Sequence, residues 1–195
     1  MKLDEEEPEI PALGFQNFKV ISAVGRGAKG VVFLAKDEAS NEFLALKVIA
    51  KALIEGKGKA VNSDGGEYKR ISFEQQVLRR FSHPLLPRLR GVLATENVVA
   101  YAIDYCPGGN LHSLRKRQTE KMFSDDVIRF YAAELVLALQ YLHSLGIVYR
   151  DLKPENVMIQ ENGHIMLVDF DLSTRLSPKS PRSSPDSDLV PNLTR

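Results

Sequence analysis

Residues 149–156 read Tyr-Arg-Asp-Leu-Lys-Pro-Glu-Asn and bring a carboxylate, an ammonium group and an amide close together in the chain. A carboxylate such as that of Asp151 can orient a hydroxyl group and accept its proton. The ammonium of Lys153 can neutralise phosphoryl charge, and the amide oxygen of Asn156 is a ligand that suits Mg²⁺. A polar turn before a strand is the alternative, but a turn does not require this ordered set of side chains. The octapeptide therefore indicates a catalytic loop for phosphoryl transfer.

The overall composition indicates a globular chain of one or two domains. The 195 residues are 44% hydrophobic and 26% charged, which is enough apolar material for a core. Lys plus Arg number 26 against 25 Asp plus Glu, so the formal net charge is +1. Without an excess of one charge, nucleic acid is not an expected partner.

The single cysteine, Cys106, excludes an internal disulfide and suits a reducing compartment. We therefore expect a cytoplasmic location, with the nucleus and the peripheral plasma membrane as alternatives. The sequence predicts neither a signal peptide nor a transmembrane segment. The acidic residues 1–14 are predicted to form a disordered leader, and the Ser/Pro-rich residues 177–195 a disordered tail.

Three glycines, Gly25, Gly27 and Gly30, follow the pattern Gly-x-Gly-x-x-Gly between two strand-like segments, residues 15–24 and 31–36. Dinucleotide-binding folds use the same pattern, but there a helix follows the glycines, whereas β-branched and aromatic residues follow them here. Glycines allow a backbone to approach phosphate groups closely. An ordinary glycine-rich hairpin is the alternative to a phosphate-binding loop.

A lysine, Lys47, stands within the apolar strand predicted over residues 42–49, on the same face as the small Ala45. Because an unpaired ammonium group is costly to bury, this lysine predicts an anionic partner. Apolar residues at helical spacing predict a helix over residues 70–81. Glu74 lies in this helix, and its carboxylate is the expected partner of Lys47. The alternatives are a lysine on an edge strand and a glutamate on the surface.

Two further strands, residues 88–93 and 98–105, lead into the turn Pro107-Gly-Gly109. A short helix is then predicted to begin at Asn110, and a long helix to cover residues 124–145. The apolar stripe expected to be buried on the long helix consists of Val127, Phe130, Tyr131, Leu135, Ala138, Tyr141 and Leu142.

After the octapeptide, strand-like residues 157–159 and 165–168 flank a turn at residues 161–163 and predict a second hairpin. This hairpin delivers Asp169-Phe-Asp171. The Asp169 carboxylate and the Asn156 amide are hard oxygen ligands, and Mg²⁺ keeps part of its water shell when it binds such groups. A magnesium site therefore needs no cage of His or Cys residues.

The chain resembles a eukaryotic Ser/Thr protein kinase over about residues 15–175. The glycine loop, the Ala-x-Lys strand, the helix glutamate, the Tyr-Arg-Asp loop and the Asp-Phe pair occur in the order typical of that family. Tyr149 followed by Arg-Asp-Leu-Lys-Pro-Glu-Asn resembles the AGC group. Asp169-Phe-Asp-Leu-Ser173 and Cys106-Pro-Gly-Gly-Asn-Leu-His112 resemble the plant AGC VIII kinases.

This resemblance implies an α/β (α+β) two-lobed fold, with a β-rich N-lobe over residues 15–105 and a partial helical C-lobe over residues 106–176. It implies ATP and Mg²⁺ as cofactors, a protein substrate with Ser or Thr hydroxyls, and an upstream activating kinase as a further partner. The implied catalytic residues are Asp151, Lys153, Lys47 and Glu74, and the implied metal ligands are Asn156 and Asp169. The implied nucleotide contacts are Gly25, Gly27, Gly30, Val32, Ala45, Lys47, Ile103, Asp104, Cys106, Asn110 and Met158.

The resemblance also assigns roles around the adenine. Backbone groups of Asp104 and Cys106 would bond the adenine edge, Ile103 would limit access behind it, and Asn110 would reach the ribose. A plain strand-to-turn connection explains the same composition and is the alternative. The two faces of the adenine would be covered by Val32 and Met158.

The chain departs from the family pattern in two ways. Asp171 replaces a glycine, which is expected to narrow the conformational choices of the triplet. The sequence also stops at Arg195, before the activation segment and the later helices of the family. The alternative to a Ser/Thr kinase is therefore a truncated, catalytically weak nucleotide-binding or regulatory fragment, and we expect the chain by itself to bind ATP weakly.

Overall fold

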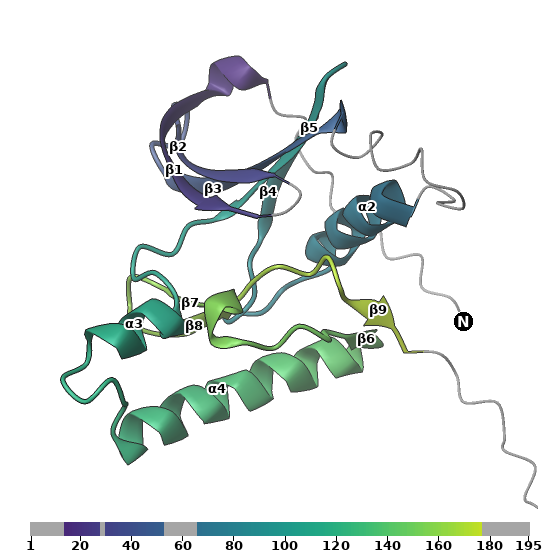
Figure 1. The fold of residues 1–195 in the computed structure, drawn as a ribbon. Coiled ribbons are helices and arrows are strands. Elements are labelled where there is room, and N and C mark those ends of the chain that lie inside the picture. Colours follow the sequence, from purple (N-terminus) through teal and green to yellow (C-terminus); the bar gives the residue numbers. More distant parts are fainter. Residues whose placement is uncertain (1–13, 28–29, 53–65, 177–195) are drawn as a thin grey trace, which may run out of the picture.

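The structure is a computed structural model that describes residues 14–27, 30–52 and 66–176 (Figure 1). Most of the expected acidic leader and all of the expected Ser/Pro-rich tail lie outside the described residues. Figure 1 shows a β-sheet with one helix in the upper part of the molecule, and two helices with short strands in the lower part. This is the predicted arrangement of a β-rich N-lobe and a helical C-lobe.

The N-lobe sheet is antiparallel throughout, with strand order β1-β2-β3-β5-β4. The strands are β1 (Phe18–Arg26), β2 (Val31–Asp37), β3 (Phe43–Ala50), β4 (Leu89–Ala94) and β5 (Val98–Asp104), and the 3-10 helix η1 (Phe15–Asn17) precedes them. The predicted alternation holds in β3, where Leu44 and Leu46 are buried with Ala35, Ala100 and Ala102. It fails in the edge strand β1, whose residues after Phe18 are all exposed.

Helix α2 (Gly66–Arg79) covers the other face of the sheet. It begins four residues before the predicted start at Arg70. Its Ile71, Val77 and Leu78 are buried in one cluster with Tyr101 from β5. The helix therefore presents its inward face, which includes Glu74, to the strand face that carries Lys47.

The lower part of the molecule is built around α4 (Asp125–Ser144), with α3 (Leu111–Arg117) beside one of its ends (Figure 1). Both predicted caps are confirmed: the Ser124 hydroxyl accepts a hydrogen bond from the Val127 N–H, and Gly146 adopts a positive φ of 70° just beyond the helix. The remaining elements are β6 (Ile147–Val148), the 3-10 helix η3 (Pro154–Asn156), β7 (Val157–Ile159), β8 (Ile165–Leu167) and β9 (Thr174–Arg175).

The predicted hairpin is present as β7 and β8, which pair in antiparallel register. A second pair, β6 with β9, was not predicted. The predicted burial of Phe130 on α4 is wrong, because its side chain is 45% exposed and lies against Tyr131 and His164. Among the described residues, no helix is long and apolar enough to cross a membrane.

Candidate functional site

Lys47 forms the centre of an ion-pair network between the two lobes. Its Nζ lies 3.1 and 3.0 Å from the Glu74 Oε1 and Oε2 atoms, and 3.2 Å from Asp169 Oδ1. The Glu74 side chain is almost fully buried, whereas that of Asp169 is 40% exposed. Burial lowers the pKa of Lys47, but Tyr101, Glu74 and Asp169 raise it, and the net pKa lies well above its usual value. Lys47 is therefore a charged ammonium, and its predicted pairing with Glu74 is confirmed.

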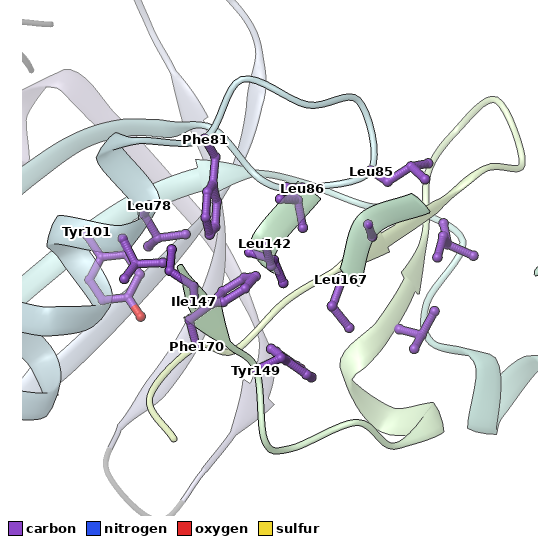
Figure 2. Packing of buried hydrophobic residues seen from close by; sticks show 14 of the residues in the cluster. Leu78, Phe81, Leu85, Leu86, Tyr101, Leu142, Ile147, Tyr149, Leu167 and Phe170 are labelled. Atoms are coloured by element: carbon purple, nitrogen blue, oxygen red, sulfur yellow. The ribbon is translucent and has the colours of Figure 1, made fainter. Parts of the chain in front are cut away.

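Glu74 also binds the backbone that follows Asp169. The Phe170 N–H donates a hydrogen bond of 3.1 Å to Glu74 Oε1. The Phe170 ring is fully buried, with its centroid 4.8 Å from that of Phe81 and 5.2 Å from that of Tyr149 (Figure 2). Both contacts are edge-to-face, an arrangement that aromatic rings favour. The position of Asp169 is thus fixed by α2 and by a packed aromatic cluster.

The octapeptide brings its three chemical groups together, as predicted. Lys153 Nζ lies 2.6 Å from Asp151 Oδ2, and the Asn156 amide donates to the same oxygen at 2.8 Å and to the Asp151 carbonyl at 3.0 Å. The hydrogen bond from Lys153 is the main cause that holds the pKa of Asp151 below its usual value. Asp151 is therefore an ionised carboxylate whose orientation is fixed from two sides.

The backbone around this loop is held by its neighbours. The Tyr149 hydroxyl donates to the Val168 carbonyl, and the Val168 N–H donates to the Asn156 carbonyl at 3.0 Å. Arg150 and Asp169 have positive φ values of 68° and 64°, which non-glycine residues seldom adopt. These contacts bring Asn156 next to the segment that carries Asp169.

The three glycines of the loop differ in the space that a Cβ atom would find at each position. A Cβ atom built on Gly25 or Gly27 would meet no atom closer than 3.6 Å. A Cβ on Gly30 would lie 2.2 Å from the Val48 carbonyl oxygen of β3. Gly30 therefore makes room for the neighbouring strand, and the approach of all three glycines to phosphates stays a prediction.

The predicted hinge residues lie at the end of β5. Ala45 pairs with Ile103, and Val32 pairs with Lys47 on the opposite side of β3. The Asp104 carboxylate accepts hydrogen bonds from the Arg88 N–H and from the Arg90 guanidinium. The prediction for Asp104 concerns its backbone groups at the adenine edge, and these side-chain hydrogen bonds do not involve them.

The remaining three predicted nucleotide contacts follow the hinge. The Cys106 thiol is buried and lies 3.6 Å from the Met166 sulfur. Asn110 and Met158 form an isolated β-bridge, which brings them together. The side-chain oxygen of Asn110 accepts from the Ser113 N–H and caps α3, so its amide N–H groups and one further acceptor site on that oxygen are left for another partner.

Sequence reasoning missed buried polar residues, among them Glu134 and Tyr101. Glu134 of α4 is buried, accepts a hydrogen bond of 2.9 Å from the Ile165 N–H and contacts His164 Nδ1. Tyr101 lies directly opposite Lys47 in the register of β3 and β5. The available signal for Tyr101 was its position beside a lysine on the same sheet face, whereas nothing in the sequence marks Glu134 as buried.

Comparisons with known proteins show the family of the chain. The model of the protein kinase domain matches residues 18–189. Serine/threonine-protein kinase OXI1 of Arabidopsis thaliana is 65% identical over 183 residues, which is 94% of this chain and 43% of the relative. Serine/threonine-protein kinase AGC1-5 of Arabidopsis thaliana is 42% identical over 165 residues, 85% of this chain and 27% of the relative.

Serine/threonine-protein kinase RHS3 of Arabidopsis thaliana is 43% identical over 167 residues, which is 85% of this chain and 32% of the relative. The chain thus spans less than half the length of these three curated relatives. The percentages of residues that the chain shares with these plant kinases confirm the resemblance to plant AGC kinases that the motifs indicate. The chain belongs to the protein kinase family.

Proposed function

We propose that the protein that carries this chain is an ATP-dependent Ser/Thr protein kinase, which transfers the γ-phosphoryl group to hydroxyls of protein substrates. The family implies the use of ATP and typically of Mg²⁺. The observation that carries the proposal is the Lys47 network with Glu74 and Asp169, because a kinase needs this lysine–glutamate pair and a metal-binding aspartate in place. The similarity to proteins named serine/threonine-protein kinases supports the choice of Ser and Thr.

The residues fit a bound nucleotide. Lys47 offers an ammonium group to the phosphates, and Gly25 and Gly27 leave open space where a side chain would otherwise stand. Val32 and Ala45 lie on adjacent strands, opposite Lys47 and Ile103 respectively. We assign the adenine to the space between these residues and Met158, with its edge at the backbone of Asp104 and Cys106 and its ribose at Asn110.

The donor set also fits Mg²⁺. Asp169 offers a partly exposed carboxylate, and the Asn156 N–H₂ group is engaged by Asp151, which leaves the amide oxygen for a metal. A bound Mg²⁺ would neutralise charge on the phosphate oxygens.

In this proposal Asp151 is the acceptor of the substrate proton. Its ionised carboxylate orients the Ser or Thr hydroxyl, whose oxygen forms the new bond to the γ-phosphorus while ADP leaves. Lys153, held 2.6 Å from Asp151, neutralises charge on the transferring group. The fixed, ionised Asp151 favours an enzyme over the alternative of a regulatory fragment.

The test uses the full-length protein with Mg²⁺, γ-labelled ATP and a degenerate peptide library that contains Ser, Thr and Tyr acceptors. We expect label on Ser and Thr but not on Tyr. The Asp151→Asn variant serves as the control and should incorporate little label. Label on Tyr alone, or equal labelling by the variant, would contradict the proposal.

A further inference from the structure

Tyr101 carries a buried polar atom without a partner. Only 1% of the residue is exposed, and its hydroxyl has no hydrogen bond to any residue that the structure describes. Figure 2 shows Tyr101 in the same buried cluster as Leu78 and Phe170, with its hydroxyl oxygen in red. A buried hydroxyl without a partner costs stability, so its presence calls for a physical reason.

The charged groups next to Tyr101 are those of the Lys47 network. Lys47 Nζ lies 5.5 Å from the centroid of the Tyr101 ring, a distance that suits a cation–π contact. Burial, followed by the negative charge of Glu74, raises the pKa of Tyr101 well above its usual value. The hydroxyl therefore keeps its proton at neutral pH and can act only as a neutral donor or acceptor.

The hydrogen bonds of the Lys47 network explain why the Tyr101 hydroxyl donates no hydrogen bond. Lys47 directs its three N–H groups to the two Glu74 oxygens and to Asp169. Glu74 Oε1 accepts from Lys47 and from the Phe170 N–H, whereas Oε2 accepts only from Lys47 among the described residues. Because each carboxylate oxygen can accept about two hydrogen bonds, one acceptor site on Glu74 is unfilled.

We propose that Tyr101 is a positioning residue whose hydroxyl is the reserve donor to Glu74, used when Lys47 turns toward an anion in the cleft. The inference rests on the proposed function, in which that anion is the phosphate chain of the nucleotide. When Lys47 gives one N–H to the phosphates, the buried Glu74 carboxylate loses a donor. The Tyr101 hydroxyl then replaces it, so that Glu74 keeps its place against Lys47 and Phe170.

The decisive variant is Tyr101→Phe, which keeps the ring beneath Lys47 and removes only the hydroxyl. In the full-length protein without nucleotide, we expect a melting temperature equal to or above that of the wild type, because an unpartnered buried group is lost. Binding of a non-hydrolysable ATP analogue with Mg²⁺, measured by calorimetry, should weaken by about 10-fold, the size expected for loss of a hydrogen bond to a charged group.

The matched control is Tyr131→Phe, since Tyr131 belongs to α4 and its ring lies against Phe123 and Phe130. This variant should bind the analogue like the wild type. Equal affinity of Tyr101→Phe and the wild type would overturn the inference alone, as would a marked fall in the melting temperature of the nucleotide-free variant. Failure of the wild type itself to bind the analogue would overturn the proposed function and the inference with it.

Discussion

The Phe170 N–H donates its hydrogen bond to Glu74, the same carboxylate that pairs with Lys47. A helix of the N-lobe thereby fixes both the lysine of the sheet and the backbone that carries Asp169. Since the Glu74 side chain is only 3% exposed, the loss of its charge leaves Lys47 partly buried with one anionic partner fewer.

We predict that Glu74→Gln lowers the unfolding free energy by about 1–3 kcal/mol, the usual cost of an uncompensated buried group, and also lowers phosphoryl transfer. Urea denaturation measures the first effect. The control is Glu42→Gln, which breaks the exposed ion pair with Arg90 and should cost at most about 1 kcal/mol. Equal costs for the two variants would mean that Glu74 has no special structural role.

The glycine loop predicts a contrast between two alanine variants. Gly30→Ala should destabilise the fold by about 1–3 kcal/mol, because the new Cβ would press on the Val48 carbonyl of β3. Gly27→Ala meets no such obstacle and should fold normally but bind Mg²⁺ and the ATP analogue more weakly. Thermal denaturation and calorimetry separate these effects, and a stable Gly30→Ala protein would refute the packing role.

Glu134 predicts a stability effect remote from the site. Glu134→Ala removes the acceptor of the buried Ile165 N–H, which should cost about 1–3 kcal/mol of unfolding free energy. Glu134→Gln keeps an acceptor oxygen of similar shape and should cost less. If urea denaturation ranks the two variants in the opposite order, the buried carboxylate rather than the hydrogen bond is what matters.

Cys106 predicts a pH dependence. Burial, together with the charge of Asp104, raises the pKa of the thiol to about 12. The native state therefore keeps its proton, whereas an unfolded thiol ionises near pH 8.5, so the stability contribution falls as the pH rises above about 8.5. Native Cys106 should resist iodoacetamide at pH 8 and react after unfolding, as followed by peptide mass spectrometry. Rapid native labelling would contradict this assignment.

The parts of the fold that the sequence predicted are those with a local cause. Lys47 in an apolar strand requires an anion, and Ser124 and Gly146 have the side chain and the backbone freedom that begin and end α4. The β6–β9 pair escaped prediction because two-residue strands show no periodicity, and their pairing depends on contacts distant in sequence.

The exposure or burial of other side chains depends on which surfaces pack together in the tertiary structure. Phe130 follows the helical spacing of its stripe, but the buried face of α4 is narrower than the stripe and leaves the ring exposed. Glu134 is buried because its carboxylate meets the Ile165 N–H, which helical periodicity cannot reveal. Tyr101 falls within the strand predicted over residues 98–105, and its buried hydroxyl without a hydrogen-bond partner becomes evident only in the structure, beside Lys47 and Glu74.

The most direct test of the account compares Asp151→Asn and Asp169→Asn in the full-length protein at saturating ATP and Mg²⁺. Asp151→Asn should bind the Mg²⁺-loaded ATP analogue normally yet lose about 10²–10⁴-fold in turnover, because it lacks the carboxylate that accepts the substrate proton. Asp169→Asn should lose both turnover and metal-dependent affinity, since it lacks the carboxylate that would bind Mg²⁺. Unchanged turnover in both variants would contradict the account.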